Sequence, residues 1–216
     1  MKRIEDIKDI KDIKSGLYDS INLHLMQDDT PSGYLERMAG DTVFHEYPFR
    51  MLLKLKDVEQ SEKYHPEGNV WNHTMLVIDE AAAVKTESRD SQAFMWAALL
   101  HDIGKPDTTI IRKGRITSYD HDRTGAQLAG KFLSEFMEED GFIEKVTSLV
   151  RYHMHMLYVL KDLPYGNTGM LLKEVDIHDI ALLCLCDRLG RGRVSRGEEE
   201  DNYRKFLFRL QSHTTS

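Results

Sequence analysis

Hydrophobic residues recur at helical spacing along most of the 216-residue chain, and no alternating pattern is long enough for a sheet. We therefore predict an all-α fold, a helical bundle. The clearest helices are expected at residues 73–87, 93–100, 124–137, 142–153 and 176–189, with a final helix at 199–210. Asn72 is a candidate cap for the first of these. A basic stretch at 108–122 contains Lys113-Gly114, which favours a small hairpin.

The N-terminal part differs from the rest in its pattern. Isoleucines at 4, 7, 10 and 13 predict a short amphipathic helix that packs on the domain or on a neighbouring chain. Residues 27–33 predict a loop, and residues 34–57, interrupted by Pro48, predict two helices. A further long loop is expected around Pro164, Gly166 and Gly169. We divide the chain into a helical extension at 1–60 and a main domain at 61–210.

Composition narrows the classes of function. The formal net charge of −7 disfavours a protein that mainly grips nucleic-acid backbone, although a local basic patch stays possible. Cys184 and Cys186 stand in an apolar run and are expected to be reduced core residues. No apolar stretch approaches about 18 residues, and the charged start does not resemble a signal peptide. We expect a cytoplasmic protein without a membrane span.

Candidate chemistry centres on Leu-Leu-His-Asp-Ile-Gly-Lys-Pro at 99–106. His101 and Asp102 follow an apolar helical run that Gly104 and Pro106 end. Burying an unpaired charge is costly, and a metal ion is the simplest partner for a histidine and a carboxylate together. Several other residues share this position at helix ends or on apolar faces, namely His73, His121, His153, His155 and Asp187.

Four segments carry a family resemblance: HPEGNVWNHT, LLHDIGKP, YDHDRTGAQLA and CDRLGRG. Their order resembles the HD superfamily of metal-dependent phosphohydrolases. Over residues 64–195 they are similar to the HD domain attached to bacterial CCA-adding enzymes, the tRNA nucleotidyltransferases. The nucleotidyltransferase head of those enzymes, with its Gly-Ser and paired-carboxylate motif, does not fit within the first 60 residues. We therefore expect the hydrolase module standing alone, without CCA addition.

The resemblance implies a metal centre of one or two divalent ions. One ion would be held by His73, His101, Asp102 and Asp187. His121 and His153 would add a second ion, with Asp102 bridging the two. Imidazole-rich sites suit Mn, Fe, Co, Ni or Zn, and Mg is possible.

The resemblance also implies hydrolysis at phosphorus, with Asp102 and Lys105 as catalytic residues. Lys105 would meet the developing negative charge; otherwise it is a solvated lysine at a helix end. Arg188 and Arg191 would bind the substrate, or else form salt bridges to residues 198–201. His65 and Glu67 would line the pocket. His155, two residues after His153, is expected on the other side of a helix, as a substrate contact or a surface residue.

Three functions remain open at this point. The first is a phosphohydrolase acting on a small phosphorylated substrate, a nucleotide or cyclic nucleotide, or on an RNA end. The second is a di-iron oxygenase, because some HD proteins with the same ligand order use O₂. The third is a non-catalytic module that binds nucleotides or RNA ends, although such a module needs no ordered ligand set. The sequence leaves the substrate, the native metal and the oligomeric state open.

Overall fold

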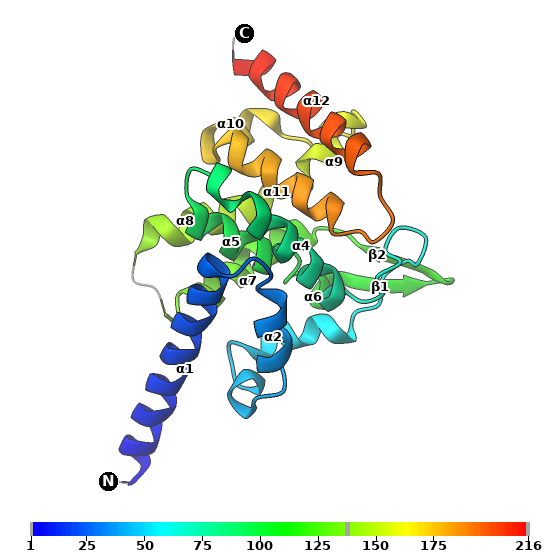
Figure 1. Ribbon diagram of the computed structural model, residues 1–216. Helices are drawn as coiled ribbons and strands as arrows, with labels where there is room; N and C mark the ends of the chain where they lie inside the picture. Colours follow the sequence, from blue (N-terminus) through cyan, green and yellow to red (C-terminus); the bar gives the residue numbers. More distant parts are fainter. Residues whose placement is uncertain (1, 137–138, 215–216) are drawn as a thin grey trace.

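The computed structural model describes the backbone of residues 2–136 and 139–214, and the side chains of 10–136 and 139–213. The prediction of an all-α fold is confirmed: helices form the body, and within the described residues the strands are confined to one small hairpin (Figure 1). None of the described helices combines the length and apolarity that a membrane crossing requires.

The elements follow one another from a long N-terminal helix to a long C-terminal helix. The α-helices are α1 (Lys2–Gln27), α2 (Ser32–Met38), α3 (Arg50–Leu53), α4 (Val70–Val84), α5 (Ser91–Leu100), α6 (Lys105–Thr108), α7 (His121–Leu133), α8 (Asp140–Tyr152), α9 (His155–Leu160), α10 (Thr168–Glu174), α11 (Ile177–Leu189) and α12 (Arg196–Thr214). Short 3₁₀ helices lie at Thr42–His45, Lys54–Asp57 and Lys85–Glu87, and the strands are β1 (Thr109–Arg112) and β2 (Arg115–Ser118).

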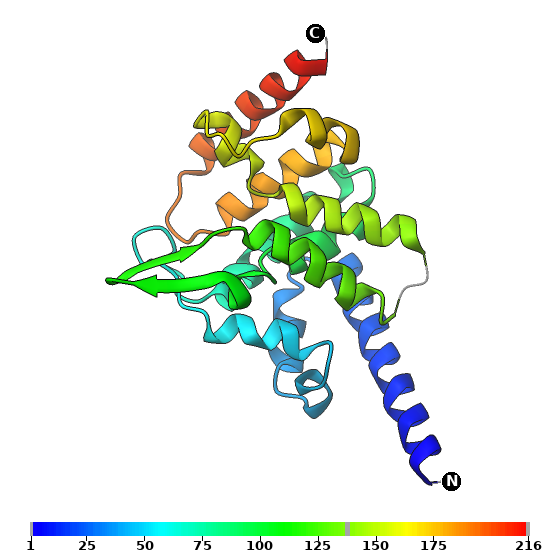
Figure 2. The same cartoon turned by 180° about the vertical axis from the view of Figure 1, so that it is seen from behind.

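Helix α5 is the centre of the core. Every residue from Ala93 to Leu100 is buried, so this helix is covered on all sides. It packs against α1, α4, α8 and α11, while α7 covers α8 and α12 covers α11 (Figure 2). The His-Asp doublet that follows α5 therefore enters the middle of the bundle.

Side-chain caps set where the site-bearing helices begin. Asp90 accepts from the Ala93 N–H at the start of α5, and Asp176 accepts from the His178 N–H at the start of α11. For α4 the predicted cap was wrong by three residues. Asn69 is the cap and accepts from the Asn72 N–H, so the helix begins at Val70 rather than near His73.

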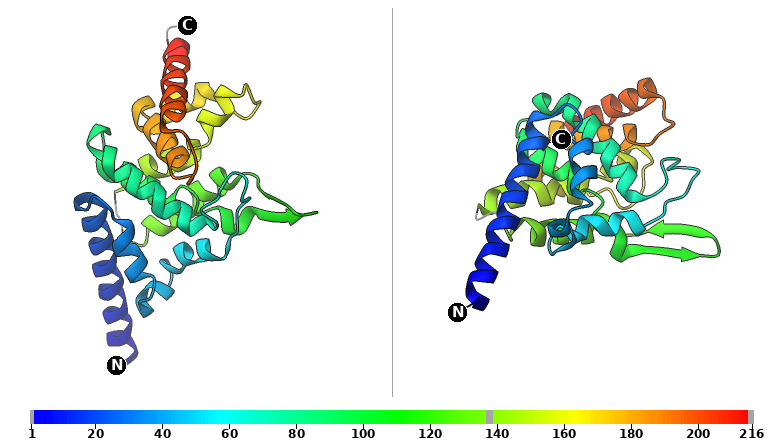
Figure 3. Two further views of the ribbon diagram at one scale, coloured as in Figure 1. Left: turned by 45° about the vertical axis from the view of Figure 1, so that its right-hand side comes forward. Right: turned by 60° about the horizontal axis from the view of Figure 1, so that its bottom comes forward.

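The predicted hairpin is confirmed. Strands β1 and β2 pair antiparallel with Ile111 opposite Ile116, and Lys113 and Gly114 both have positive φ in the turn. The hairpin projects from the helical body in every view (Figure 3).

Several local predictions differ from the structure. Helix α1 runs to Gln27, and Leu17 is the first of its described side chains that is buried in the core; Ile10 and Ile13 are exposed, and the side chains at 4 and 7 lie outside the described ones. Helix α7 starts at His121 and ends at Leu133, and residue 137 lies outside the described residues. Helices α9 and α10 flank a loop that is shorter than expected. The boundary at residue 60 stays a prediction, although both parts contribute to one hydrophobic cluster.

Gly104 permits the closest backbone approach in the core. It was predicted as a helix-stop residue, but its φ of −81° is accessible to any residue. The constraint is space, because a Cβ here would lie 2.2 Å from the His121 carbonyl oxygen and 2.5 Å from the Gly125 nitrogen. The glycine thus lets the turn after α5 rest directly on α7.

We expect Gly104→Ala to destabilise the fold by about 3 kcal/mol, the upper end of the usual cost of overpacking, because backbone atoms cannot move aside as side chains do. Gly141→Ala is the matched control: nothing lies within 4 Å of its Cβ position, and it stands in the first turn of α8. The control should change stability by less than about 1 kcal/mol. Urea unfolding of both variants measures the difference, and equal midpoints would contradict the packing argument.

Candidate metal centre

Six predicted ligand residues converge at the ends of five helices. His73 lies in the first turn of α4, His101 follows the last residue of α5, and Asp102 stands in the turn after it. His121 opens α7, and His153 follows the last residue of α8. Asp187 lies in the last turn of α11. All six side chains are buried.

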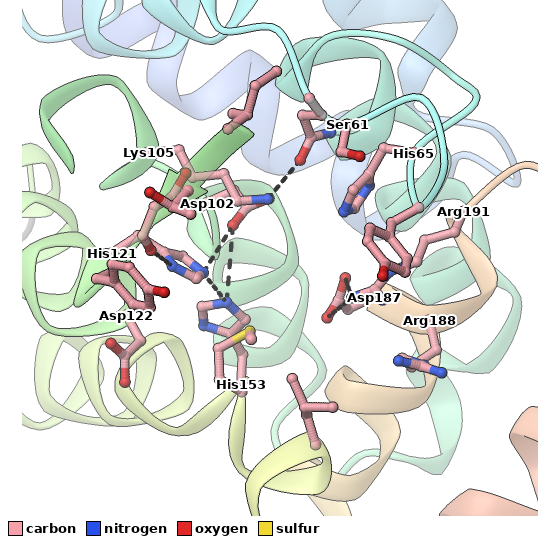
Figure 4. Close-up of a pocket in the computed structure, with 18 of the residues that line it drawn as sticks. Ser61, His65, Asp102, Lys105, His121, Asp122, His153, Asp187, Arg188 and Arg191 are labelled. Carbon is pink, nitrogen blue, oxygen red and sulfur yellow. Dashed lines mark hydrogen bonds and ion pairs between the residues drawn. The ribbon is translucent and has the colours of Figure 1, made fainter. Parts of the chain in front are cut away.

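Asp102 is the point on which the cluster converges, and Figure 4 shows it with two of the imidazoles, those of His121 and His153. Its Oδ2 lies 3.2 Å from His101 Nε2 and 3.9 Å from His73 Nε2, and its Oδ1 lies 3.5 Å from His121 Nε2 and 3.8 Å from His153 Nε2. Two groups with metal-ligand spacing share this carboxylate, one with His73 and His101, the other with His121 and His153. Asp187 joins the first group through His73 Nε2, which is 3.0 Å from Asp187 Oδ1.

Backbone carbonyls fix the orientation of three of these imidazoles. The Nδ1 of His101, His121 and His153 lies 2.8, 2.6 and 2.6 Å from the carbonyl oxygen three residues earlier. A carbonyl only accepts, so Nδ1 carries the proton and, in the neutral ring, Nε2 carries a lone pair. Each lone pair faces the Asp102 carboxylate.

This arrangement of acceptors fits a cation. His121 Nε2 and His153 Nε2 are 3.2 Å apart, and the buried His101 Nε2 has no hydrogen-bond partner among the described residues. Lone pairs that face each other and a carboxylate repel unless positive charge lies among them. Imidazole Nε2 with Nδ1 held by a carbonyl is also the usual form of a metal-bound histidine.

The pKa values of the carboxylates keep them charged. Burial by itself would raise the pKa of Asp102, but the charge of Lys105, followed by that of His101, lowers it well below its usual range. For Asp187, Arg191 and then His73 likewise outweigh burial and lower the pKa. Both groups therefore offer anionic oxygens at neutral pH.

The pKa values of His121 and His153 shift in the opposite direction from that of His73. Burial, with the charges of His121 and His101, lowers the pKa of His153 to about 3, and burial also lowers the pKa of His121. These two rings are neutral, as metal ligation requires. Burial opposes protonation of His73 too, but hydrogen bonds to Asp187 and Glu67 raise its pKa.

The Glu67 carboxylate contacts the Nδ1 side of the His73 ring. Its Oε1 lies 3.0 Å from His73 Nδ1 and 2.8 Å from His65 Nδ1, and its Oε2 accepts from the Gly192 N–H. The Glu67 side chain is buried and is not part of the cleft wall, which disfavours its predicted substrate contact. Its position instead makes it an orienting group, which leaves His73 Nε2 facing Asp102 and Asp187.

A cleft of about 1410 Å³ opens over the cluster. Lys105 lies in its wall, with Nζ 2.7 Å from Asp102 Oδ2 and 2.7 Å from Gln60 Oε1. Arg191 also lines the cleft and lies 3.3 Å from Asp187 Oδ2. Arg188 lines it as well but is held by two hydrogen bonds to Glu199, the salt bridge that was weighed as its alternative.

His155 differs from its prediction. Helix α8 ends at Tyr152, so His153 and His155 do not share one regular helix. His155 is only 1% exposed, packs against Tyr152 and Tyr158, and is not part of the cleft wall. A surface position is therefore wrong, and the wall of the cleft gives no support to a substrate contact.

Sequence reasoning missed two groups beside the cluster. Asp122 is buried, lines the cleft and pairs with Arg151. Its signal was present, because His121-Asp122 is a second His-Asp doublet. Gln60, which accepts from Lys105, had no such signal because it lies 45 residues away in a polar stretch.

The HD domain family model matches residues 70–192, more than half of the chain. The chain belongs to the HD-domain family. The match spans every residue of the cluster from His73 to Asp187, and members of this family bind divalent metals. Among the described residues, the groups His73, His101, Asp102 and Asp102, His121, His153 have the spacing to hold such an ion, as does a third group of His65, Glu67 and His73.

Curated relatives share the domain at low identity. The chain is 28% identical over 169 residues to the Multifunctional CCA protein of Pasteurella multocida (strain Pm70), which covers 75% of the chain and 39% of that protein. It is 26% identical over 195 residues to the protein of the same name from Actinobacillus pleuropneumoniae serotype 5b (strain L20), covering 84% and 45%. The chain thus spans less than half the length of these relatives.

We expect Glu67→Ala to weaken binding of Mn²⁺ by roughly 10- to 100-fold, because His73 Nδ1 loses its nearer acceptor and keeps only the Gly190 carbonyl oxygen at 3.4 Å. Glu67→Gln keeps an acceptor oxygen and should recover most of the affinity. Glu62→Ala, which removes an exposed carboxylate from the same loop, is the control. Calorimetric titration gives the three affinities. An unchanged affinity in Glu67→Ala would remove Glu67 from the orienting role.

Proposed function

We propose that this protein is a metal-dependent phosphohydrolase that acts on a phosphate ester of a nucleotide, a cyclic nucleotide or an RNA end. The observation that carries the proposal is the convergence of three imidazole lone pairs on the Asp102 carboxylate. The similarity to Multifunctional CCA proteins supports a nucleotide-bearing substrate.

The ligand set proposed for the ions follows the two groups that share Asp102. His73, His101, Asp102 and Asp187 would hold one ion, and Asp102, His121 and His153 a second. The donors suit Mn, Fe, Co, Ni or Zn, and Mg less well. A divalent ion bound there would supply hydroxide at neutral pH by lowering the pKa of its water.

Lys105 and Arg191 give the chain its own means of binding a phosphate. The Lys105 ammonium lies at the cleft wall beside Asp102, where it can meet negative charge that develops on a phosphoryl oxygen. The Arg191 guanidinium is held only by long contacts to Asp187, and its buried Nε has no hydrogen-bond partner among the described residues. The two contacts of Lys105 leave one of its three N–H donors for an anionic substrate, and the long contacts of Arg191 leave it donors as well.

We expect Asp102→Ala to lose bound metal and phosphate release together, because the carboxylate shared by both ligand groups is gone. Elemental analysis of the purified protein identifies the metal. A phosphate-release screen then uses nucleoside monophosphates, cyclic nucleotides and oligoribonucleotides with a terminal phosphate.

Asp107→Ala, which removes an exposed carboxylate from α6, should change neither metal content nor phosphate release. A metal-free Asp102→Ala variant that remains active would refute the site. Uptake of O₂ by the iron-loaded protein, without phosphate release from any nucleotide, would assign the oxygenase reaction instead.

Lys105→Ala should lower turnover by roughly 10²- to 10³-fold, the usual effect of removing one group that stabilises transition-state charge. Metal content should stay unchanged, because Lys105 pairs with Asp102 but contributes no ligand atom. Steady-state kinetics with metal analysis on the same sample separates the two effects. Loss of metal with loss of turnover would show that the lysine is structural.

A further inference from the structure

The cleft is larger than the metal cluster at its base needs. Pockets for compact ligands usually enclose about 300–1,000 Å³, and this cleft encloses about 1410 Å³. Four separate segments form its outer wall: the loop at 58–66, strand β2 with the residues after it, the stretch from the end of α8 to residue 165, and the end of α11. An occupant could therefore extend well beyond a single phosphate.

Exposed tyrosines are concentrated on this wall. Tyr64, Tyr119 and Tyr165 are 60%, 72% and 66% exposed, and all three line the cleft from different segments. Tyr165 also contacts the ring of Tyr158, another wall residue, with centroids 5.6 Å apart. Among the large aromatic side chains that the structure describes as exposed, Phe208 alone lies outside the cleft wall. Exposed rings around one cleft are platforms for flat ligands.

Cations without an acidic partner line the same wall. Lysine and arginine outnumber aspartate and glutamate there by nine to six among the described residues, although the whole chain has 29 basic and 36 acidic residues. The cations near the metal cluster are paired with carboxylates. Four exposed ones form no ion pair with any described residue, namely Lys63, Arg115, Lys161 and Arg193. Lys63 Nζ lies over the Tyr64 ring, 5.1 Å from its centroid, and the exposed Glu59 and Glu62 of the same wall form no ion pair with a described residue either. Four unpaired cations against two unpaired carboxylates leave a surplus of positive charge for an external anion.

The β-hairpin extends this surface beyond the cleft. Strand β2 runs along the wall from Arg115 to Ser118, and Tyr119 follows it. Exposed Arg112 and Lys113 continue the positive charge to the tip, which stands clear of the body (Figure 3). The hairpin adds no buried residue to the core: β1 is exposed at three of its four positions, and β2 is half-buried at three of its four.

We propose that this wall binds a single strand of nucleic acid several nucleotides long, with bases stacked on Tyr64, Tyr119 and Tyr165 and phosphates beside the unpaired cations. Rings for bases together with cations for phosphates are the two components of single-strand recognition. A duplex has its bases stacked internally, and an acidic peptide offers the rings no flat partner. That the phosphate end of the strand reaches the metal cluster rests on the proposed function; binding along the wall does not.

The test measures binding without catalysis. Fluorescence anisotropy follows a fluorescein-labelled single strand of about ten nucleotides, within the usual site size, on the full chain in EDTA. Each of Tyr119→Ala and Tyr165→Ala should weaken binding by roughly 5- to 100-fold, the usual contribution of one stacked base. Tyr119→Phe keeps the ring and should bind as the unaltered protein does. Phe208→Ala, an exposed ring outside the wall, is the matched control and should have no effect.

The contribution of the cations to binding is measured separately, from the salt dependence of the affinity. Arg115→Ala and Lys161→Ala should each reduce the slope of log affinity against log salt concentration by about 0.7, the value for one lost phosphate contact on a single strand. Lys173→Ala, an exposed lysine outside the wall, should leave it unchanged. Equal binding of a duplex of the same length, equal loss in Phe208→Ala, or no binding at all would overturn the proposal. Binding without metal-dependent phosphate release would instead overturn the proposed function and leave this surface standing.

Discussion

The structure depends on one electrostatic constraint, the burial of the Asp102 carboxylate among imidazole nitrogens that present lone pairs to it. A buried anion surrounded by acceptors is costly, and Lys105 contacts only one of its oxygens. The core around it is closely packed, with α5 buried on every side and Gly104 resting directly on α7. Close packing opposes a separation of these residues that would relieve the repulsion, so the fold favours a cation among the donors.

Two of these histidines, His101 and His153, also supply hydrogen-bond donors to the last turns of the helices that precede them. The last carbonyls of a helix lack intrahelical partners, and His101 and His153 donate Nδ1 to carbonyls in the final turns of α5 and α8. This hydrogen bond satisfies the backbone and at the same time turns Nε2 toward Asp102. Helix termination and ligand orientation are therefore one interaction, which explains why the site is built from helix ends rather than from helix faces.

The sequence predicted most of the bundle and the members of the cluster, because apolar periodicity and helix-end histidines are both local signals. It failed where the outcome depends on packing. The prediction for His155 used helical spacing from His153, but α8 ends at Tyr152, before both residues, and His155 opens α9. Glu67 was assigned to the substrate because it lies on a polar turn, and only the fold shows that its carboxylate meets His73. The positions of Gln60 and of the exposed tyrosines beside the cleft likewise depend on segments that are distant in sequence and become neighbours only in the fold. The ligand roles themselves stay predictions.

Net charge does not describe how charge is distributed in the cleft. The chain is acidic as a whole, which disfavours contact with a polyanion, yet the basic side chains of the cleft differ in whether a carboxylate pairs with them. Those beside the metal cluster, Lys105, Arg151 and Arg191, are matched by carboxylates and hold the site together. Those farther out, such as Arg115 and Lys161, are unmatched within the described chain. The electric fields of a paired cation and carboxylate largely cancel at a distance. The unpaired cations do not have this cancellation, so their field extends to the mouth of the cleft, where a long anion would first arrive. The distribution of charge, rather than its sum, therefore decides which partner this surface can attract.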